Sequence, residues 1–259
     1  MSKFQVLCAT MHQNDFSLVK KMNIESDVIF ANQCDDVSYK REDRNGCKLE
    51  MISTLSRGSG NNRNISLICA SADICLLADD DVTYYPHYKE KIIEAFKRHL
   101  DADMIIFNLD TDSTNRSLPK IRKNKKMHFW HRNPYGSVRV AFRLASQKKY
   151  NIWFSNILGA GAIYGAGEDS LFINDFRKKG NVYLCKEVLG KVDFSQSSWF
   201  TGYDANFFFN HGAKIAALYG KIGFLFMGYY AFRYRYGTDL KFGEIIQLMK
   251  KGYYDYKKL

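Results

Sequence analysis

Three consecutive aspartates follow one of the most apolar segments of this sequence. Asp79, Asp80 and Asp81 come directly after Leu76–Ala78, a segment that predicts a buried strand. Adjacent anions repel one another and contribute nothing to a hydrophobic core, so they require a compensating cation. In an extended chain the side chains of Asp79 and Asp81 point in the same direction. Such oxygen ligands suit Mg²⁺ or Mn²⁺ bound to a diphosphate, although acidic turns without a metal are also common.

Two further carboxylates, Glu168 and Asp169, begin a predicted helix that continues to about Lys179. Acidic residues in a first helical turn stabilise the helix dipole and need no other role. The glycine-rich segment 159–167 before them would, however, allow the backbone to approach a ligand closely. A carboxylate held there beside a sugar hydroxyl could act as a general base. These residues alone leave both interpretations open.

A loop with glycines and arginines, 57–64, leads into another predicted helix. Backbone N–H groups and arginine side chains at the start of a helix favour phosphate binding. The loop does not match the P-loop pattern, because no Gly-Lys-Ser/Thr follows its glycines. The segment therefore favours a phosphate-containing ligand without specifying which one.

The elements that must position these residues alternate between strands and helices. This order predicts an α/β fold with a mostly parallel sheet that helices cover on both faces, and ligands bind such sheets at the carboxyl ends of the strands. Residues 110–133 show no hydrophobic period and predict a loop, and 138–146 predict a helix. The expected strands are 4–9, 27–31, 74–78, 104–109 and 182–185, and the expected helices of the first half are 16–22, 62–71 and 88–100.

Composition restricts the class of partner. The 259 residues carry a formal net charge of +11, which predicts attraction to nucleic acid, phosphorylated ligands or an anionic membrane. Six cysteines without CxxC pairs predict mostly buried thiols in a reducing compartment, not disulfides or zinc ligands. The first residues contain no long apolar segment after a basic start, so we expect no secretory signal and a cytoplasmic protein.

The C-terminal residues are apolar, aromatic and basic. The apolar segment 215–232 is interrupted by Lys221, which leaves 11 uncharged residues before Arg233. This falls short of the roughly 20 residues that span a bilayer. The segment predicts either a helix that lies in the interface of an anionic membrane or a helix that packs on the rest of the protein.

Taken in order from Phe4 to about Gly212, the segments resemble family 2 glycosyltransferases with the GT-A fold, especially bacterial enzymes that build capsular, exopolysaccharide or lipopolysaccharide chains. The order and spacing of the segments are specific, although each is a modest signal by itself. The segments are the opening strand with Thr10, Asn32-Gln33 with Asp35 and Asp36, the set Arg57, Gly58, Arg63 and Asn64, then Ala78–Val82, Gly167–Asp169 and Ser197–Phe200.

The resemblance implies a GT-A catalytic domain over 1–212 and a helical tail over 213–259. It implies a nucleotide-sugar donor, with UDP-sugars favoured, and a metal ion, Mn²⁺ or Mg²⁺, on Asp79 and Asp81. His211 is a further candidate metal ligand, because many GT-A enzymes add a late histidine. The donor-binding residues that the resemblance implies are Thr10, Asn32, Gln33, Asp35, Asp36, Arg57, Gly58, Arg63, Asp79, Asp80 and Asp81.

For catalysis, the resemblance implies that Asp169 removes the proton from the acceptor hydroxyl and that the anomeric configuration inverts. Glu168 would orient the acceptor, and the acceptor-binding residues would be Gly161, Trp199 and Phe200. The acceptor would be a glycan or a lipid-linked molecule at the inner face of the cytoplasmic membrane.

Three other functions are compatible with parts of the sequence. A sugar nucleotidyltransferase would have a glycine-rich, arginine-containing loop directly after the first strand, and Thr10–Asn14 is not such a loop. A nucleic-acid-binding protein would use the net charge and the basic run 116–132, but would leave the three aspartates unexplained. A catalytically inactive partner subunit is disfavoured only by the intact carboxylates.

Overall fold

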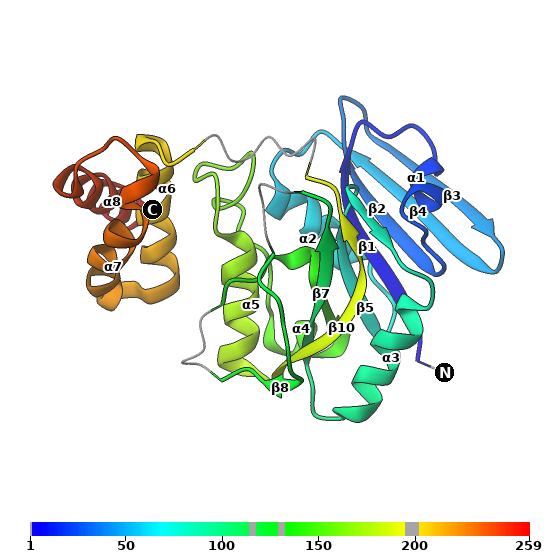
Figure 1. Ribbon diagram of the computed structural model, residues 1–259. Coiled ribbons are helices and arrows are strands. Elements are labelled where there is room, and N and C mark those ends of the chain that lie inside the picture. Colours follow the sequence, from blue (N-terminus) through cyan, green and yellow to red (C-terminus); the bar gives the residue numbers. More distant parts are fainter. Residues whose placement is uncertain (1, 114–117, 129–132, 195–201) are drawn as a thin grey trace.

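The computed structural model describes residues 2–113, 118–128, 133–194 and 202–259. Within these residues a ten-stranded mixed sheet forms the centre of the molecule, and helices cover both of its faces (Figure 1). Three further helices at the C-terminus lie beside this α/β body, at the left of Figure 1. The α/β fold with flanking helices and a helical C-terminal tail, which the sequence predicts, is confirmed.

Four strands from the first part of the chain run parallel in the order β4, β2, β1, β5. β1 (Phe4–Met11), β2 (Asp27–Gln33) and β5 (Ile74–Asp79) are apolar and largely buried, as expected of strands covered on both faces. β4 (Cys47–Thr54) alternates buried and partly exposed residues. Because the four strands are parallel, their carboxyl ends share one edge of the sheet, and Asp79 lies at that edge.

The middle of the sheet contains a strand that the sequence analysis assigns to a helix. β9 (Val140–Arg143) lies antiparallel between β5 and β7 (Met104–Thr111). The predicted helix over 138–146 is therefore wrong in its first part, and the helix that follows begins only at Leu144. The apolar side chains of β9 are fully buried, and the ladders to two neighbouring strands outweigh their helical spacing.

The last long strand fixes the turn that follows the aspartates. β10 (Val182–Val192) pairs parallel with β7 and antiparallel with β6 (Val82–Tyr84), which begins directly after Asp81. The backbone N–H of Asp193 donates to the carbonyl oxygen of Asp81 at 3.0 Å. The acidic turn is thus held between two strands. β8 (Lys125–Lys126) pairs with the other end of β10.

A hairpin that the sequence analysis does not anticipate extends the sheet at one edge. β3 (Ser38–Arg44) pairs antiparallel with β4, and Asn45 and Gly46 form the turn with φ values of +53° and +74°. Both values lie in the left-handed region that asparagine and glycine tolerate best, as a two-residue hairpin turn requires. The charged and mostly exposed residues of β3 are typical of an edge strand.

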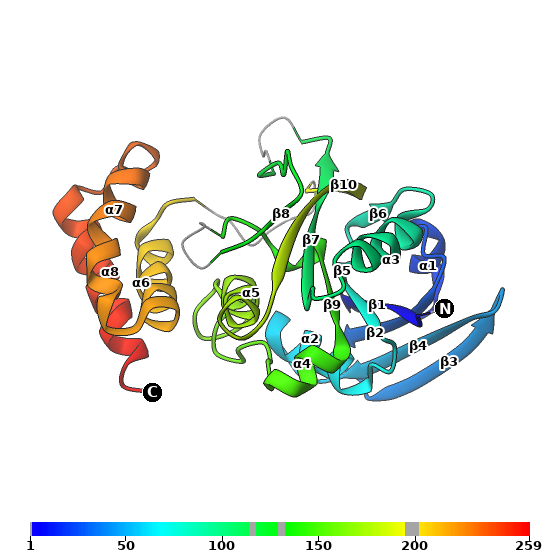
Figure 2. The same cartoon turned by 90° about the horizontal axis from the view of Figure 1, so that it is seen from below.

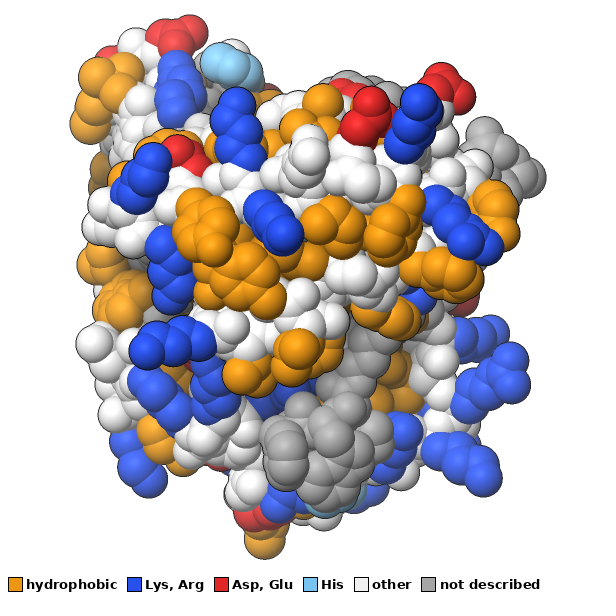
Figure 3. Space-filling model, turned by 90° about the vertical axis from the view of Figure 1, so that its left-hand side faces the viewer, with side chains coloured by type: hydrophobic (Ala, Val, Ile, Leu, Met, Phe, Trp, Pro, Cys, Tyr) orange, Lys and Arg blue, Asp and Glu red, His pale blue; other side chains and the backbone are white. Residues whose placement is uncertain are grey.

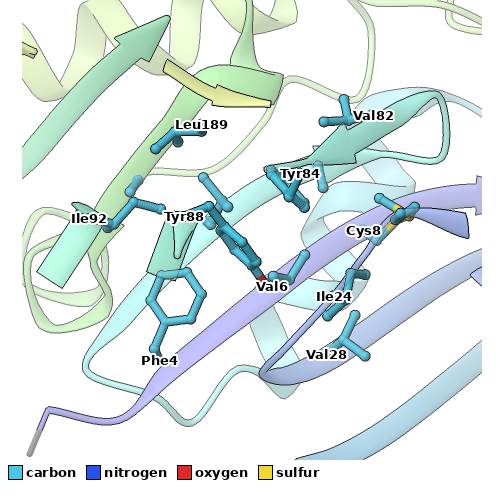
Figure 4. Packing of buried hydrophobic residues seen from close by; sticks show 14 of the residues in the cluster. Phe4, Val6, Cys8, Ile24, Val28, Val82, Tyr84, Tyr88, Ile92 and Leu189 are labelled. Atoms are coloured by element: carbon cyan, nitrogen blue, oxygen red, sulfur yellow. The ribbon is translucent and has the colours of Figure 1, made fainter. Parts of the chain in front are cut away.

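Two hydrophobic layers pack on opposite faces of the sheet. Side chains of β1 alternate between them: Val6 belongs to one layer and Leu7 to the other. Figure 4 shows the first layer, in which Tyr84 and Tyr88 stack with ring centroids 4.3 Å apart. Figure 2 shows the helices on either side of the sheet. They are α1 (Ser17–Lys21) and α3 (Tyr88–Arg98) on the first face, and α2 (Ser59–Cys69), α4 (Leu144–Tyr150) and α5 (Glu168–Lys179) on the second.

The three C-terminal helices enclose a hydrophobic cluster of their own. α6 and α8 approach so closely that a Cβ at Gly212 would lie 2.0 Å from the carbonyl oxygen of Met249. The domain boundary expected after residue 212 falls inside α6, so the helical unit begins at Ala205. The helices are α6 (Ala205–Tyr219), α7 (Phe224–Tyr234) and α8 (Phe242–Tyr256), and the cluster contains Phe208, Ile215, Met227, Ala231, Ile245 and Met249.

This helical unit is anchored to the α/β body. The hydroxyl of Tyr164 donates to Asp255 at 3.0 Å, and Tyr164 also packs with Leu158 and Ala213. One stretch, 205–237, is long and apolar enough by composition to cross a membrane. The backbone turns at Gly220, where φ is +53°, and this turn divides the stretch into α6 and α7. Part of the tail therefore packs on the protein, as one of the two interpretations of the sequence proposes.

Candidate active site

The residues after the parallel strands converge because the register of the sheet aligns the strand ends. Ala9 pairs with Asp79, and Thr10, one residue further along β1, pairs with Asn32 on β2. The hydroxyl of Thr10 donates to Asp80 across 70 residues of sequence. The structure thus brings Thr10 and the aspartate triplet together at one edge of the sheet.

Arg63 connects this edge to the start of α5. Arg63 is 5% exposed, and its guanidinium donates to both carboxylate oxygens of Asp79, at 3.0 and 3.1 Å. The other terminal nitrogen donates to Glu168 at 3.2 Å and to Asp169 at 3.1 Å. Three carboxylates from two distant segments therefore meet at one buried cation. Arg63 was expected to hold the donor, and the structure places it among carboxylates of the protein itself.

Burial and mutual repulsion alter the ionisation of these acids. Burial raises the pKa of Asp79, and the Arg63 guanidinium opposes this shift. The pKa of Glu168 is raised by burial and then by the charge of Asp169. Burial alone would lower the pKa of Arg63, but the carboxylates around it raise the pKa above its ordinary value. Arg63 is therefore a permanent cation that allows several acids to be ionised close together.

Asp169 and Glu168 differ in what they can reach. The Asp169 side chain is 29% exposed, and its second carboxylate oxygen accepts from the backbone N–H of Ser137 at 3.1 Å. Glu168 is nearly buried and accepts from the Ser59 hydroxyl at 2.9 Å and from the N–H of Gly167 at 3.1 Å. Asp169 is thus the accessible and oriented carboxylate, whereas Glu168 ties the start of α5 to the start of α2.

The glycines expected near donor and acceptor are in direct contact. Gly58 has a φ of +102°, and a Cβ at Gly161 would lie 3.2 Å from the Cα of Gly58. The N–H of Ser59 donates to the carbonyl oxygen of Ala160 at 2.8 Å, which joins the two loops. Gln33 also belongs here, since its side-chain oxygen accepts from the N–H of Gly58 at 3.0 Å.

Other predicted donor residues occupy different positions. Asn32 is completely buried. Its side-chain oxygen accepts from the backbone N–H of Gln13, and its side-chain nitrogen donates to the carbonyl oxygen of Gln13 and to the hydroxyl of Ser53. It therefore supports the loop after β1 from beneath and is not available to a ligand. Asp35 and Arg57 form an exposed ion pair at the rim of the same strand ends, and Asp36 is exposed beside them. Trp199 and Phe200 lie outside the described residues.

Asp81 is the acid whose charge remains least compensated. One of its carboxylate oxygens is buried without a hydrogen-bond partner. Burial and the charges of Asp79 and Asp80 raise its pKa to about 7, and Asp193 adds to this repulsion. A divalent cation would satisfy such a group. Within the part of the chain that the structure describes, no three acidic, histidine or cysteine side chains are arranged so that they could hold a metal ion, so a cation at Asp81 would complete its ligands from outside the protein.

His211 is not near these acids. It lies on α6, with its ring centroid 4.4 Å from that of Tyr230 and 5.6 Å from those of Phe207 and Tyr234. Burial and Lys214 lower its pKa to about 3. The expectation that His211 binds the metal is therefore corrected, because the apolar spacing of α6 turns the imidazole into the core of the helical unit.

A partly buried histidine whose pKa the fold lowers makes stability depend on pH. The unfolded chain binds a proton at His211 below about pH 6.5, whereas the folded chain does not, so acid favours unfolding. Relative to His211→Phe, the wild type should lose about 1.4 kcal/mol of unfolding free energy per pH unit below that point. Urea unfolding of both proteins at about pH 7.5 and pH 5.5 measures this difference. Parallel pH dependences would show that the imidazole titrates normally.

Comparison with known proteins supports the fold. No protein-family model and no curated protein matches the sequence. The chain is similar to the crystal structure of S. aureus TarS 1–349, with a TM-score of 0.62 at 13% identity over 99% of this chain and 91% of that one. The chain therefore shares the fold of TarS.

Two ligand complexes of TarS are equally similar. The complex with UDP-GlcNAc gives a TM-score of 0.63 at 13% identity, covering 99% of this chain and 92% of that one. The complex with UDP gives 0.62 at 14% identity, covering 98% and 83%. TarS therefore binds a nucleotide sugar within the fold that this chain shares.

Sequence reasoning missed three contributors to the site. Ser59 reaches Glu168, the backbone of Ser137 reaches Asp169, and Asp193 lies next to Asp81. Asp193 follows a buried strand directly, as Asp79 ends one, and this repeated pattern could have identified it. The contacts of Ser59 and Ser137 join residues 109 and 32 positions apart, so only the tertiary structure reveals them.

Proposed function

We propose that this chain is an inverting glycosyltransferase of the family 2 type, which moves a sugar from a UDP-sugar to a hydroxyl of a glycan or lipid-linked acceptor. The observation that carries the proposal is the buried Arg63, which joins Asp79 at the strand ends to Asp169 at the start of α5. The assembly lies at the carboxyl ends of the parallel strands, the edge at which α/β sheets bind ligands, and this supports the proposal. Because TarS binds UDP-GlcNAc, that sugar nucleotide is the first donor to test.

Asp169 is the proposed general base. Arg63 and the Ser137 N–H fix its carboxylate, and its partial exposure leaves it accessible to an acceptor. The acceptor hydroxyl gives its proton to Asp169 while its oxygen forms a bond to the anomeric carbon. The bond from that carbon to the diphosphate oxygen breaks with its electron pair, and the nucleoside diphosphate leaves. Attack from the opposite side inverts the anomeric configuration.

A divalent cation, Mn²⁺ or Mg²⁺, belongs to this proposal. Asp81 is the residue that would hold it, with Asp193 beside it, because Asp81 has an unpaired buried oxygen. Asp79 is less suited than the sequence suggests, since both of its oxygens accept from Arg63. The cation would supply positive charge to the leaving diphosphate. Thr10 and Asp80, which lie together at the end of β1, would contact the nucleoside.

Calorimetric titration with UDP, GDP and CDP, each with and without Mn²⁺, tests the donor site. We expect one nucleotide, UDP, to bind in a metal-dependent manner. In Asp81→Asn the affinity with Mn²⁺ should fall at least about tenfold, because the amide is a poorer ligand, while the metal-free affinity stays the same.

Asp43→Asn, on the exposed hairpin strand β3, is the matched control and should bind like the wild type. Undiminished metal-dependent binding in Asp81→Asn would remove Asp81 from the metal site. If the wild type bound no nucleotide under any condition, the transferase proposal itself would be contradicted.

A further inference from the structure

The helix α7 presents an apolar stripe to solvent. Ile222, Leu225, Tyr229, Phe232 and Tyr236 are 51–84% exposed. They follow one another at intervals of three or four residues, which places them on one side of the helix and its two short extensions. The opposite side carries Met227 and Ala231, which are buried against α6 and α8. Five large apolar side chains in a row are more than isolated exposed residues and indicate a surface that is covered in use.

Cations without acidic neighbours in the sequence accompany this stripe. The segment 205–238 contains Lys214, Lys221, Arg233 and Arg235 and no aspartate or glutamate. Arg235 stacks on the ring of Phe232, with its guanidinium carbon 3.9 Å from the ring centroid. Lys221 and Arg233 are exposed at the two ends of α7. Exposed cations therefore flank the apolar stripe at both ends of α7.

Apolar and cationic side chains also lie together on the surface of the helical unit. Figure 3 shows this side of the molecule, on which hydrophobic side chains alternate with lysine and arginine, and acidic side chains lie mostly along its upper edge. Tyrosines such as Tyr229 and Tyr236 have an apolar ring and a polar hydroxyl, which suits the boundary between lipid headgroups and acyl chains.

We infer that the stripe on α7, with Lys221, Arg233 and Arg235, is the surface by which the protein lies on an anionic lipid membrane. The helix would rest parallel to the membrane with its apolar side chains at the level of the acyl chains and its cations at the phosphates. The buried side of α7 packs against α6 and α8, so the exposed stripe is already formed before any membrane is bound. This inference concerns where the protein acts and does not depend on the identity of the donor.

Sedimentation with vesicles of phosphatidylglycerol and phosphatidylcholine, against vesicles of phosphatidylcholine alone, tests the inference on the full chain without substrate. The wild type should bind the anionic vesicles preferentially. Leu225→Glu should weaken this binding about tenfold or more, because it replaces an exposed apolar side chain, which would enter the acyl-chain region, by an anion. The matched control is Leu100→Glu, since Leu100 is 81% exposed and Leu225 is 80% exposed.

Lys221→Gln together with Arg233→Gln should lower the preference for anionic vesicles by about fivefold for each charge removed. Equal vesicle binding by Leu225→Glu and the wild type would overturn the inference. A second result would also overturn the inference. If the wild type bound no vesicles and light scattering showed an oligomer that Leu225→Glu dissociates, a second copy of the chain would cover the stripe. UDP binding should be unchanged in all these variants, which separates this test from that of the donor site.

Discussion

Replacing Asp169 by asparagine is expected to lower the rate of sugar transfer about a thousandfold, while UDP-sugar binding changes little. Asparagine keeps the shape of the side chain and can still accept one hydrogen bond from Arg63 or the Ser137 N–H. It cannot take the proton of the acceptor hydroxyl. Single-turnover kinetics with UDP-GlcNAc and a glycan acceptor measure the chemical step, and calorimetry measures donor binding.

Asp175→Asn is the matched control for this substitution. It makes the same change on the same helix, at a side chain that is 31% exposed compared with 29% for Asp169. Among the described residues, the only ion pair of Asp175 is a long one, with 3.8 Å between its carboxylate and the ammonium of Lys178. We expect it to retain wild-type transfer. Full activity in Asp169→Asn would show that another group accepts the proton.

Replacing Arg63 by methionine should have the largest effect on stability. The substitution leaves Asp79, Glu168 and Asp169 close together without the cation that compensates them. Removing one side of a buried ion pair costs about 3–5 kcal/mol, and we expect a loss of about this size in the free energy of unfolding. Urea unfolding at about pH 8 measures it. UDP binding should weaken as well, because Asp79 is no longer held.

The effect of Arg63→Met should shrink in acid. Burial already raises the pKa values of Asp79 and Glu168, and Arg63 opposes both shifts. Without Arg63 these two pKa values rise further above their unfolded values, so protonation at low pH relieves the repulsion and favours the folded state. Arg57→Met is the control, since Arg57 forms an ion pair with Asp35 and both side chains are at least half exposed. It should cost less than about 1 kcal/mol. Similar losses in the two variants would contradict the central role of Arg63.

Much of the sheet could be predicted from local pattern. β1, β2 and β5 are short, apolar segments bounded by polar residues, and their sequence shows this without any partner. β9 could not be predicted in this way, because its spacing also fits a helix and only the strands on both sides decide its conformation. The β3–β4 hairpin was predictable in principle from Asn45-Gly46 and its alternating flanks.

The sequence by itself determined which residues are candidates for the chemistry. An apolar strand that ends in Asp79, Asp80 and Asp81, and a glycine-rich approach to Glu168 and Asp169, are local features that need no fold to be seen. The sequence also determined the apolar and cationic character of α7, because that depends on helical spacing alone.

Only the tertiary structure decided how these residues act on one another. Arg63 joins carboxylates 16, 105 and 106 positions away, and such contacts depend on how α2 and α5 pack on the sheet. The structure likewise turned Asn32 inward and placed His211 among aromatic rings. Residue type fixes the charge and hydrogen-bonding capacity of a group, whereas burial and the neighbours that folding supplies fix whether that group binds a ligand, a proton or another side chain.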